Sequence, residues 1–165
     1  MTFQGPQRMA IIQKTIRLVR DGLLCLMKIR RSTEGDATEL ARLHRGTIRH
    51  VNSSDYSPAQ IKAWAGRTSA AKFRRHHQTH VRFVATEQGK IIGFADFGKD
   101  GSFGGLYVHK DFVGQGVGTK LIKKLEEMGK KRGVKVFEFL STKTAKHFLR
   151  TERLSVPWKE NVSRR

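Results

Sequence analysis

Cysteine is rare in this chain, and acidic residues are few compared with basic ones. The only cysteine among its 165 residues is Cys25, which excludes an intrachain disulfide and gives no basis for a thiolate zinc site. A solitary thiol fits a reducing compartment, so we expect a cytoplasmic protein. Long apolar runs are also missing. No stretch approaches the roughly 20 apolar residues that a membrane-spanning helix needs, so we expect no membrane span.

The shortage of acidic residues leaves a large positive charge. The chain has 14 Asp and Glu against 33 Lys and Arg, a formal net charge of +19. This excess favours contact with polyanions such as nucleic acid, an acidic membrane surface or an anionic cofactor. The basic residues are spread along the chain, however, and a solvated Lys/Arg-rich surface explains them equally well. The charge therefore allows a polyanionic partner without requiring one.

The length suits one compact domain with a core of its own. Apolar and basic residues alternate from Met27 to Arg31, which predicts a first strand. We therefore place the domain at residues 27–165. Residues 1–26 are basic and amphipathic, and charges interrupt them too often for a secretory signal. We interpret them as an N-terminal basic extension, with Met27 as the natural start.

The hydrophobic pattern predicts an α/β order along the rest of the chain. The expected helices cover about 34–51, 58–66, 68–78, 117–132 and 144–151, and the later strands cover 81–86, 91–97, 103–109 and 134–140. Short turns join the first three of these strands, so they should pair as antiparallel hairpins. The pattern indicates a single α/β (α+β) domain with a sheet flanked by helices.

A glycine-rich loop precedes the long helix at residues 117–132. Its sequence is Val113-Gly114-Gln115-Gly116-Val117-Gly118-Thr119. Free backbone N–H groups at a helix N-terminus bind phosphate, and glycines let the ligand approach the main chain. The P-loop pattern does not fit. The dinucleotide pattern fits weakly, because Thr119 takes the place of its third glycine. A tight turn that binds nothing is the remaining alternative.

Four segments resemble the GNAT superfamily of N-acetyltransferases. Leu106–Leu121 is similar to its motif A, and Ser141–Phe148 to the start of its motif B. Thr47–Trp64 resembles the first two helices of one subgroup, and Ile91–Phe94 the strand before the hairpin. The resemblance implies a single GNAT-like domain with a mixed central sheet flanked by helices. Its last strand should be missing or divergent, because the C-terminal sequence departs from the family pattern.

The resemblance implies that acetyl-CoA is the co-substrate and a primary amine the acceptor, with direct attack in a ternary complex. Main-chain groups of Leu106, Tyr107 and Val108 would hold the pantetheine arm, and an N–H near Val108 would stabilise the oxyanion. The pyrophosphate would lie in the loop formed by Val113, Gly114, Gln115, Gly116, Val117, Gly118 and Thr119. No metal is expected.

Two departures affect the predicted chemistry. Val113 stands where the family usually has Gln or Arg, although its main chain can still serve. Leu149 stands where the family often has a tyrosine that protonates the leaving thiolate, so solvent would have to do so. Tyr107 and His109 are the candidates for the catalytic base, and each has a structural alternative. By analogy, Asp55-Tyr56 should help to shape the acceptor pocket.

Several functions remain open at this stage. The acceptor could be a small molecule, a protein amine or an aminoacyl-tRNA, and the last would give the positive charge a role. A catalytically silent module that binds acyl-CoA is the first alternative. A basic nucleic-acid-binding protein is the second, although the aromatic pattern of common RNA-binding domains is missing. His76 and His80 have the spacing of a helical metal pair, but we interpret them as a solvated helix end.

Overall fold

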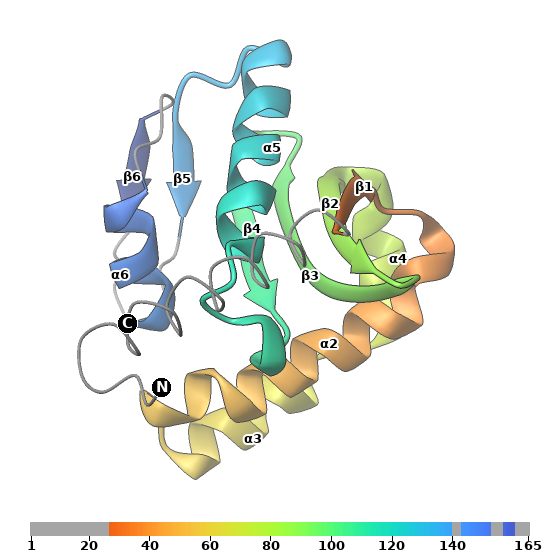
Figure 1. Cartoon of the computed structure of the whole chain (residues 1–165), viewed down its shortest axis with the longest axis vertical. Coiled ribbons are helices and arrows are strands. Elements are labelled where there is room, and N and C mark those ends of the chain that lie inside the picture. The colour runs from red at the N-terminus through yellow and green to blue at the C-terminus, as the bar shows by residue number, and fades with distance from the viewer. Residues whose placement is uncertain (1–26, 140–142, 153–156, 161–165) are drawn as a thin grey trace, which may run out of the picture.

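The computed structural model describes residues 27–139, 143–152 and 157–160 (Figure 1). The predicted extension at 1–26 and the opening of the predicted motif B, residues 141–142, lie outside these ranges. In chain order the elements are β1 (Lys28–Arg31), α2 (Ala37–His50), α3 (Pro58–Gly66), α4 (Ala70–Thr79), β2 (His80–Glu87), β3 (Lys90–Gly98), β4 (Phe103–Val108), α5 (Val117–Lys131), β5 (Phe137–Phe139), α6 (Lys143–Thr151) and β6 (Trp158–Glu160). The predicted α/β order is confirmed.

Short polar signals set the starts of α3 and α4. The hydroxyl of Ser57 accepts a hydrogen bond from the N–H of Gln60 at 3.3 Å, and Pro58 opens α3. Proline suits this position because the first N–H of a helix has no partner inside the helix. Ser69 caps α4 in the same way, accepting from the N–H of Lys72 at 3.2 Å. These caps place α3 and α4 beside α2, where they line the candidate site.

The first four strands form one antiparallel sheet in the order β1-β2-β3-β4. The helices α2 to α4 separate β1 from β2 along the chain, whereas β2, β3 and β4 follow one another as hairpins. The turn between β2 and β3 uses Gln88 and Gly89, both with positive φ. The interiors of β2 and β3 are buried on both faces. The strand β4 is at one edge of this sheet, and directly before it Ser102 forms a parallel bridge with Glu138 of β5.

Two apolar clusters fix the helices on the two faces of the sheet (Figure 1). On one face, α5 contributes the buried residues Val117, Leu121, Ile122 and Leu125. On the other face, α2 and α4 contribute Ala37, Leu40, Ala41, Leu43 and Phe73. Each large side chain buried in this way stabilises the fold by about 1.5–3 kcal/mol. Helices thus cover both faces of the sheet.

A second, two-stranded sheet lies beyond β4. The strands β5 and β6 are parallel, with Phe137 opposite Trp158 at a ring separation of 4.9 Å. The predicted strand at 134–140 is shorter than expected, because Val134–Val136 precede the ladder and Val136 is exposed. The last strand was expected to be missing or divergent; a strand of three residues occupies its place and pairs with β5.

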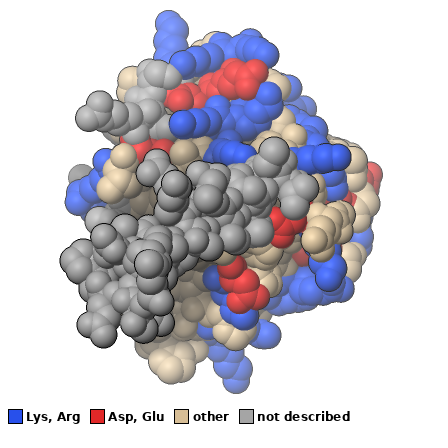
Figure 2. All heavy atoms as spheres, in the orientation of Figure 1, with Lys and Arg blue, Asp and Glu red and all other residues tan. Residues whose placement is uncertain are grey.

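The surface carries the charge that the composition predicts. In Figure 2, Lys and Arg cover much of the visible described surface, and acidic residues gather in a few small groups. Within the described ranges, no helix combines the length and apolarity needed to cross a bilayer.

Candidate functional site

The outer edge of β4 presents main-chain groups that β3 does not use. The N–H of His109 donates to the carbonyl of Ile92 at 2.8 Å, directly beyond the pair Gly93–Val108. In an antiparallel ladder this bond makes Gly93–Val108 a pair that is not hydrogen-bonded, so Val108 directs its N–H and C=O outward. Leu106, two residues earlier, has the same orientation.

Tyr107 lies between these two residues and has the opposite orientation. Its partner across the ladder is Phe94, so its main-chain groups face β3. Of the three residues predicted to hold the pantetheine arm, Leu106 and Val108 therefore offer outward main-chain groups, whereas Tyr107 offers its side chain. The carbonyl of Val108 also accepts a hydrogen bond from the Thr47 hydroxyl at 3.0 Å, which ties α2 to this edge.

The glycine-rich loop leads from β4 into an α5 N-terminus that has no side-chain cap. Gly114 and Gly116 have φ values of 77° and 79°, and Gly116 is the N-cap of α5. This left-handed conformation favours glycine. The first helical bond runs from the N–H of Lys120 to the carbonyl of Gly116. The helix ladder therefore leaves three N–H groups at its start, those of Val117, Gly118 and Thr119. This is the arrangement that binds phosphate.

Other side chains hold the loop in shape without covering its main chain. The amide of Gln115 donates to the carbonyl of Asp111 at 2.6 Å, so this side chain folds back onto the loop. Val113 is 51% exposed, and its side chain makes the loop locally apolar. A Cβ at Gly118 would lie 3.1 Å from the ring of Phe148, which packs α6 against the first turn of α5.

The helix α6 brings a carboxylate to the same turn. The hydroxyl of Thr119 donates to Glu152 at 2.6 Å. The sequence predicts that Thr119 belongs to the pyrophosphate loop but gives no sign of this partner. Leu149 is buried in the core beside α5, so the position that often carries a tyrosine in the family faces the interior here.

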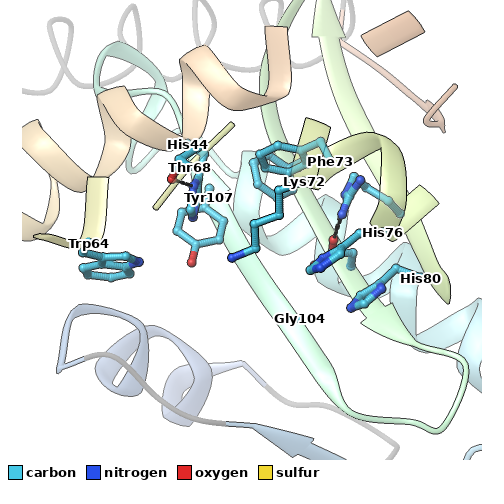
Figure 3. Close-up of a pocket in the computed structure, with 12 residues that line it drawn as sticks. His44, Trp64, Thr68, Lys72, Phe73, His76, His80, Gly104 and Tyr107 are labelled. Atoms are coloured by element: carbon cyan, nitrogen blue, oxygen red, sulfur yellow. Dashed lines mark hydrogen bonds and ion pairs between the residues drawn. The ribbon is translucent and has the colours of Figure 1, made fainter. Parts of the chain in front are cut away.

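A cavity of about 170 Å³ lies on the α2/α4 face of the sheet (Figure 3). Its walls come from α2, α3, α4 and strands β2 to β4. The lining residues are His44, Trp64, Thr68, Lys72, Phe73, His76, His80, Arg82, Phe94, Asp96, Gly104 and Tyr107. The strand β4 therefore separates two features, with α5 and its loop on one face and this cavity on the other.

A buried ion pair forms part of the cavity wall. Nε of Arg82 donates to Oδ2 of Asp96 at 2.7 Å, and both side chains are at least 94% buried. The guanidinium also lies over the ring of Phe73, 4.7 Å from its centroid. The carboxylate of Asp96 packs directly against Gly104, where any Cβ would collide with it. Two opposite charges in apolar strands were the sequence signal for this pair, and the antiparallel register brings them together.

His44 also lines the cavity and was missed from the sequence. Its Nδ1 is 2.7 Å from the hydroxyl of Thr68, and its ring meets that of Tyr107 edge to face at 4.2 Å. Burial lowers the pKa of His44 to about 4, and the positive charges of Lys72 and Arg82 act in the same direction. The imidazole is therefore neutral at pH 7. Its helical spacing from Leu40 and Ile48 was the available signal, because it places His44 on the inner side of α2.

The two predicted catalytic residues lie in different places. The ring of Tyr107 lines the cavity, and burial, followed by the negative charge of Asp96, raises its pKa above the ordinary value. Its hydroxyl therefore stays protonated at neutral pH and can donate a hydrogen bond, but it is a poor base. His109 is 41% exposed and is not part of the cavity lining. Its Nδ1 accepts from the N–H of Asp111 at 3.3 Å, which caps the turn after β4.

His76 and His80 are close together, but no metal cluster surrounds them. Their rings stack at 4.7 Å and both line the cavity. Over the described part of the chain, no group of three or more His, Cys, Asp or Glu is placed to hold a metal ion. The prediction that His76 and His80 form a solvated helix end is incomplete, because both residues also line the cavity.

A second hollow, of about 340 Å³, lies against α2 and α3. Its lining residues are Arg49, Ser53, Tyr56, Pro58, Ile61 and Lys62. Tyr56 meets the ring of Trp64 edge to face at 5.7 Å, and Trp64 lines the first cavity. The contact between Tyr56 and Trp64 thus lies between the two hollows. The part of Tyr56 in an acceptor pocket stays a prediction.

This chain is similar to known proteins in sequence and in fold. Residues 52–151 match the protein family described as acetyltransferase (GNAT) domain. A similar solved structure is that of a GCN5-related N-acetyltransferase from Rhodopseudomonas palustris, with 32% identity and a TM-score of 0.71. The match covers 74% of this chain and 78% of that one.

Two more distant structures show the same fold. The PaiA N-acetyltransferase of Thermoplasma acidophilum, in complex with coenzyme A, is 19% identical with a TM-score of 0.59, and the match covers 66% of this chain and 74% of that one. An aminoglycoside acetyltransferase from an uncultured soil metagenomic sample, in complex with sisomicin, is also 19% identical. Its TM-score is 0.61, and the match covers 85% of this chain and 94% of that one.

Proposed function

This chain belongs to the acetyltransferase (GNAT) domain family, and we propose that it transfers an acetyl group from acetyl-CoA to a primary amine by direct attack in a ternary complex. One observation carries the proposal. The outward main-chain groups of Leu106 and Val108 lie between a helix N-terminus without a side-chain cap and a cavity lined by polar groups. A phosphate site, an edge for an extended arm and an acceptor cavity thus adjoin one strand.

The cofactor residues follow from this arrangement. The N–H groups of the loop from Val113 to Thr119 bind the pyrophosphate, because the start of α5 supplies donors and a positive dipole end. The pantetheine arm adds to the open edge of β4, where Leu106 and Val108 present their main-chain groups. The acetyl thioester then lies beside Val108 and faces the cavity past Tyr107.

The reaction needs few groups beyond this alignment. The neutral amine attacks the thioester carbon, the new C–N bond forms, and the C–S bond breaks to release the CoA thiolate. The N–H of Val108 stabilises the oxyanion of the tetrahedral intermediate. Holding the two reactants together supplies a large part of the rate. A thiol pKa of about 8.5 makes the thiolate a tolerable leaving group, so solvent can protonate it without a tyrosine at Leu149.

Tyr107 and His44 form the side of the cavity that meets the amine. Tyr107 keeps its proton, and its phenol oxygen accepts a hydrogen bond from an N–H of the amine, so the nitrogen lone pair stays available for attack. His44 acts through Tyr107, since its neutral ring packs against the phenol at 4.2 Å and is anchored by Thr68. After the attack the nitrogen carries a positive charge, and it loses one proton to solvent at the mouth of the cavity.

Two measurements test the proposal. Isothermal titration with acetyl-CoA should show binding, and thiol release in the presence of an amine panel should show transfer. Absence of binding at millimolar acetyl-CoA contradicts the proposal. Binding without thiol release for any amine favours a silent acyl-CoA-binding module, and a salt-sensitive shift with tRNA but not with acetyl-CoA favours a nucleic-acid-binding protein.

Matched glycine variants assign the binding to the loop. Gly114 and Gly89 both have φ near 78°, and a side chain added at either would enter open space, so valine strains each backbone by about 1–2 kcal/mol. Gly114→Val should weaken acetyl-CoA binding about tenfold or more, whereas Gly89→Val in the β2–β3 turn should leave it unchanged. Gly114→Asn should retain binding, because asparagine tolerates this conformation. Equal effects at Gly114 and Gly89 would count against the loop.

A further inference from the structure

The cavity beside Tyr107 has an unusual balance of charge for a site that receives an amine. Its lining includes two basic side chains besides histidine, Lys72 and Arg82, and a single carboxylate, Asp96. Oδ2 of Asp96 is already bonded to Arg82, and the carboxylate packs against Gly104. The described lining therefore has no further carboxylate that could pair with an ammonium group of a bound amine.

The histidines do not reverse this balance. His44 is neutral at pH 7, because burial and neighbouring cations lower its pKa to about 4. Burial, and then the charge of His80, lowers the pKa of His76 as well. At pH 8, above the ordinary histidine pKa of about 6.5, the excess charge of the cavity comes from Lys72.

Lys72 is placed to use that charge. It lies in the first turn of α4, where Ser69 caps its N–H, so the position of its Cα is fixed by the helix start. Figure 3 shows its ammonium pointing into the cavity, toward the hydroxyl of Tyr107. Within the described residues, no carboxylate forms an ion pair with Lys72.

We infer that the acceptor is a small amine that also carries an anionic group, a carboxylate or a phosphate, and that Lys72 binds this group. The inference rests on the proposed function and names the acceptor class. The oxyanion pairs with the ammonium of Lys72, and the amine of the same molecule reaches past Tyr107 to the thioester. A polycationic acceptor would instead bring ammonium groups to Lys72 with no carboxylate to compensate their desolvation.

The size of the cavity agrees with a small acceptor. Its volume of about 170 Å³ is below the roughly 300–1,000 Å³ of pockets that hold drug-sized ligands. The aromatic rings of Trp64, Phe73 and Phe94 form the apolar part of the lining. A short carbon chain between the amine and the anion matches this surface.

Four amines of similar length test the acceptor class. β-Alanine carries a carboxylate, O-phosphoethanolamine a phosphate, propylamine no second charge, and 1,3-diaminopropane a second ammonium. Thiol release is measured at pH 8 with saturating acetyl-CoA. At least one anionic acceptor should exceed propylamine and diaminopropane in kcat/KM by about tenfold or more, as expected for a charge-assisted bond. The first two compounds distinguish carboxylate from phosphate. A kcat/KM for diaminopropane or propylamine that equals or exceeds both anionic values overturns the inference.

Lysine variants assign the preference to Lys72. Lys72→Met should lower kcat/KM for the preferred anionic acceptor about tenfold more than it lowers kcat/KM for propylamine. Lys72→Arg should restore most of the preference, because it restores the charge. Lys90→Met replaces a lysine at the start of β3, away from the cavity, and should change neither value. An equal loss for all acceptors in Lys72→Met would mean that Lys72 acts only on the fold.

The same experiment separates the inference from the proposed function. Transfer to propylamine and diaminopropane without an anionic preference keeps the function and refutes the inference. If acetyl-CoA binds but no amine releases thiol, the transferase proposal fails. The inference is then decided by titrating β-alanine and O-phosphoethanolamine into the CoA-saturated protein. Binding that Lys72→Met weakens supports an anion site, and absence of binding refutes it.

Discussion

The neutral imidazole of His44 makes the stability of this fold depend on pH. In the unfolded chain a histidine has a pKa of about 6.5, whereas burial lowers that of His44 to about 4 in the folded protein. Between these values the unfolded chain binds a proton that the folded protein does not. The stabilisation is therefore complete above pH 6.5 and is lost as the pH falls toward 4.

The size of this effect follows from the difference between the two pKa values. A depression of about 2.5 units corresponds to about 3 kcal/mol over the full range, and to about 2 kcal/mol between pH 7 and pH 5. Lys72, Arg82 and Arg45 add to the depression, so protonated His44 would be both buried and surrounded by cations. A loss of this size is a large part of the stability of an ordinary domain.

Urea unfolding at pH 7, 6 and 5 measures the effect in wild-type and His44→Asn protein. Asparagine can keep the bond to Thr68 but does not titrate, so the variant should be less stable at pH 7 and lose about 2 kcal/mol less on acidification. His76, whose pKa burial also lowers, is present in both proteins and cancels. Parallel slopes for wild-type and His44→Asn protein would refute the reasoning.

Two further predictions concern buried and paired charges. Arg82→Met should destabilise the protein by about 3–5 kcal/mol in urea unfolding, because it leaves Asp96 buried without its partner. The double variant Arg82→Met/Asp96→Leu should lose less stability than Arg82→Met alone. A larger loss of stability in the double variant would contradict this account. Glu152→Gln should tighten acetyl-CoA binding a few fold by titration calorimetry, because it removes a negative charge bonded to Thr119 at the proposed phosphate site. Unchanged affinity would place the pyrophosphate elsewhere.

The parts of the fold that depend on local signals could be predicted from the sequence. Ser57-Pro58 marks the start of α3 because cap and proline act within one turn. The stripe from Val117 to Leu125 predicts α5 because its period matches one face of a helix. The short turns at Gln88-Gly89 and Asp100-Gly101 predict antiparallel hairpins because so few residues can only reverse the chain.

The parts that depend on contacts between distant segments could not be predicted. The bond from Arg82 to Asp96 requires the register of β2 against β3, which the sequence does not state. The bond from Thr119 to Glu152 requires the docking of α6 on α5. The pairing of β5 has the same origin, since it depends on β6 and, through Glu138, on Ser102.

The candidate site shows the same division. The glycine loop was predictable because Gly114 and Gly116 have a local role, the left-handed conformation that opens the start of α5. The cavity was not, because its lining comes from six separate elements. Tyr107 was singled out for its place in the motif, but only the structure shows that its side chain faces the cavity and that its main chain is bonded to β3.

The positive charge of this protein acts over two different ranges. The Lys and Arg residues on the surface in Figure 2 are screened by salt beyond about 8 Å at physiological ionic strength, so they favour the approach of anions without selecting among them. Lys72 is exposed as well, but its ammonium points into the cavity beside Tyr107, so an anion bound there would touch it directly, well within the screening length. A preference for anionic acceptors that persists at high salt would therefore originate in the cavity, whereas a preference that salt abolishes would originate on the surface.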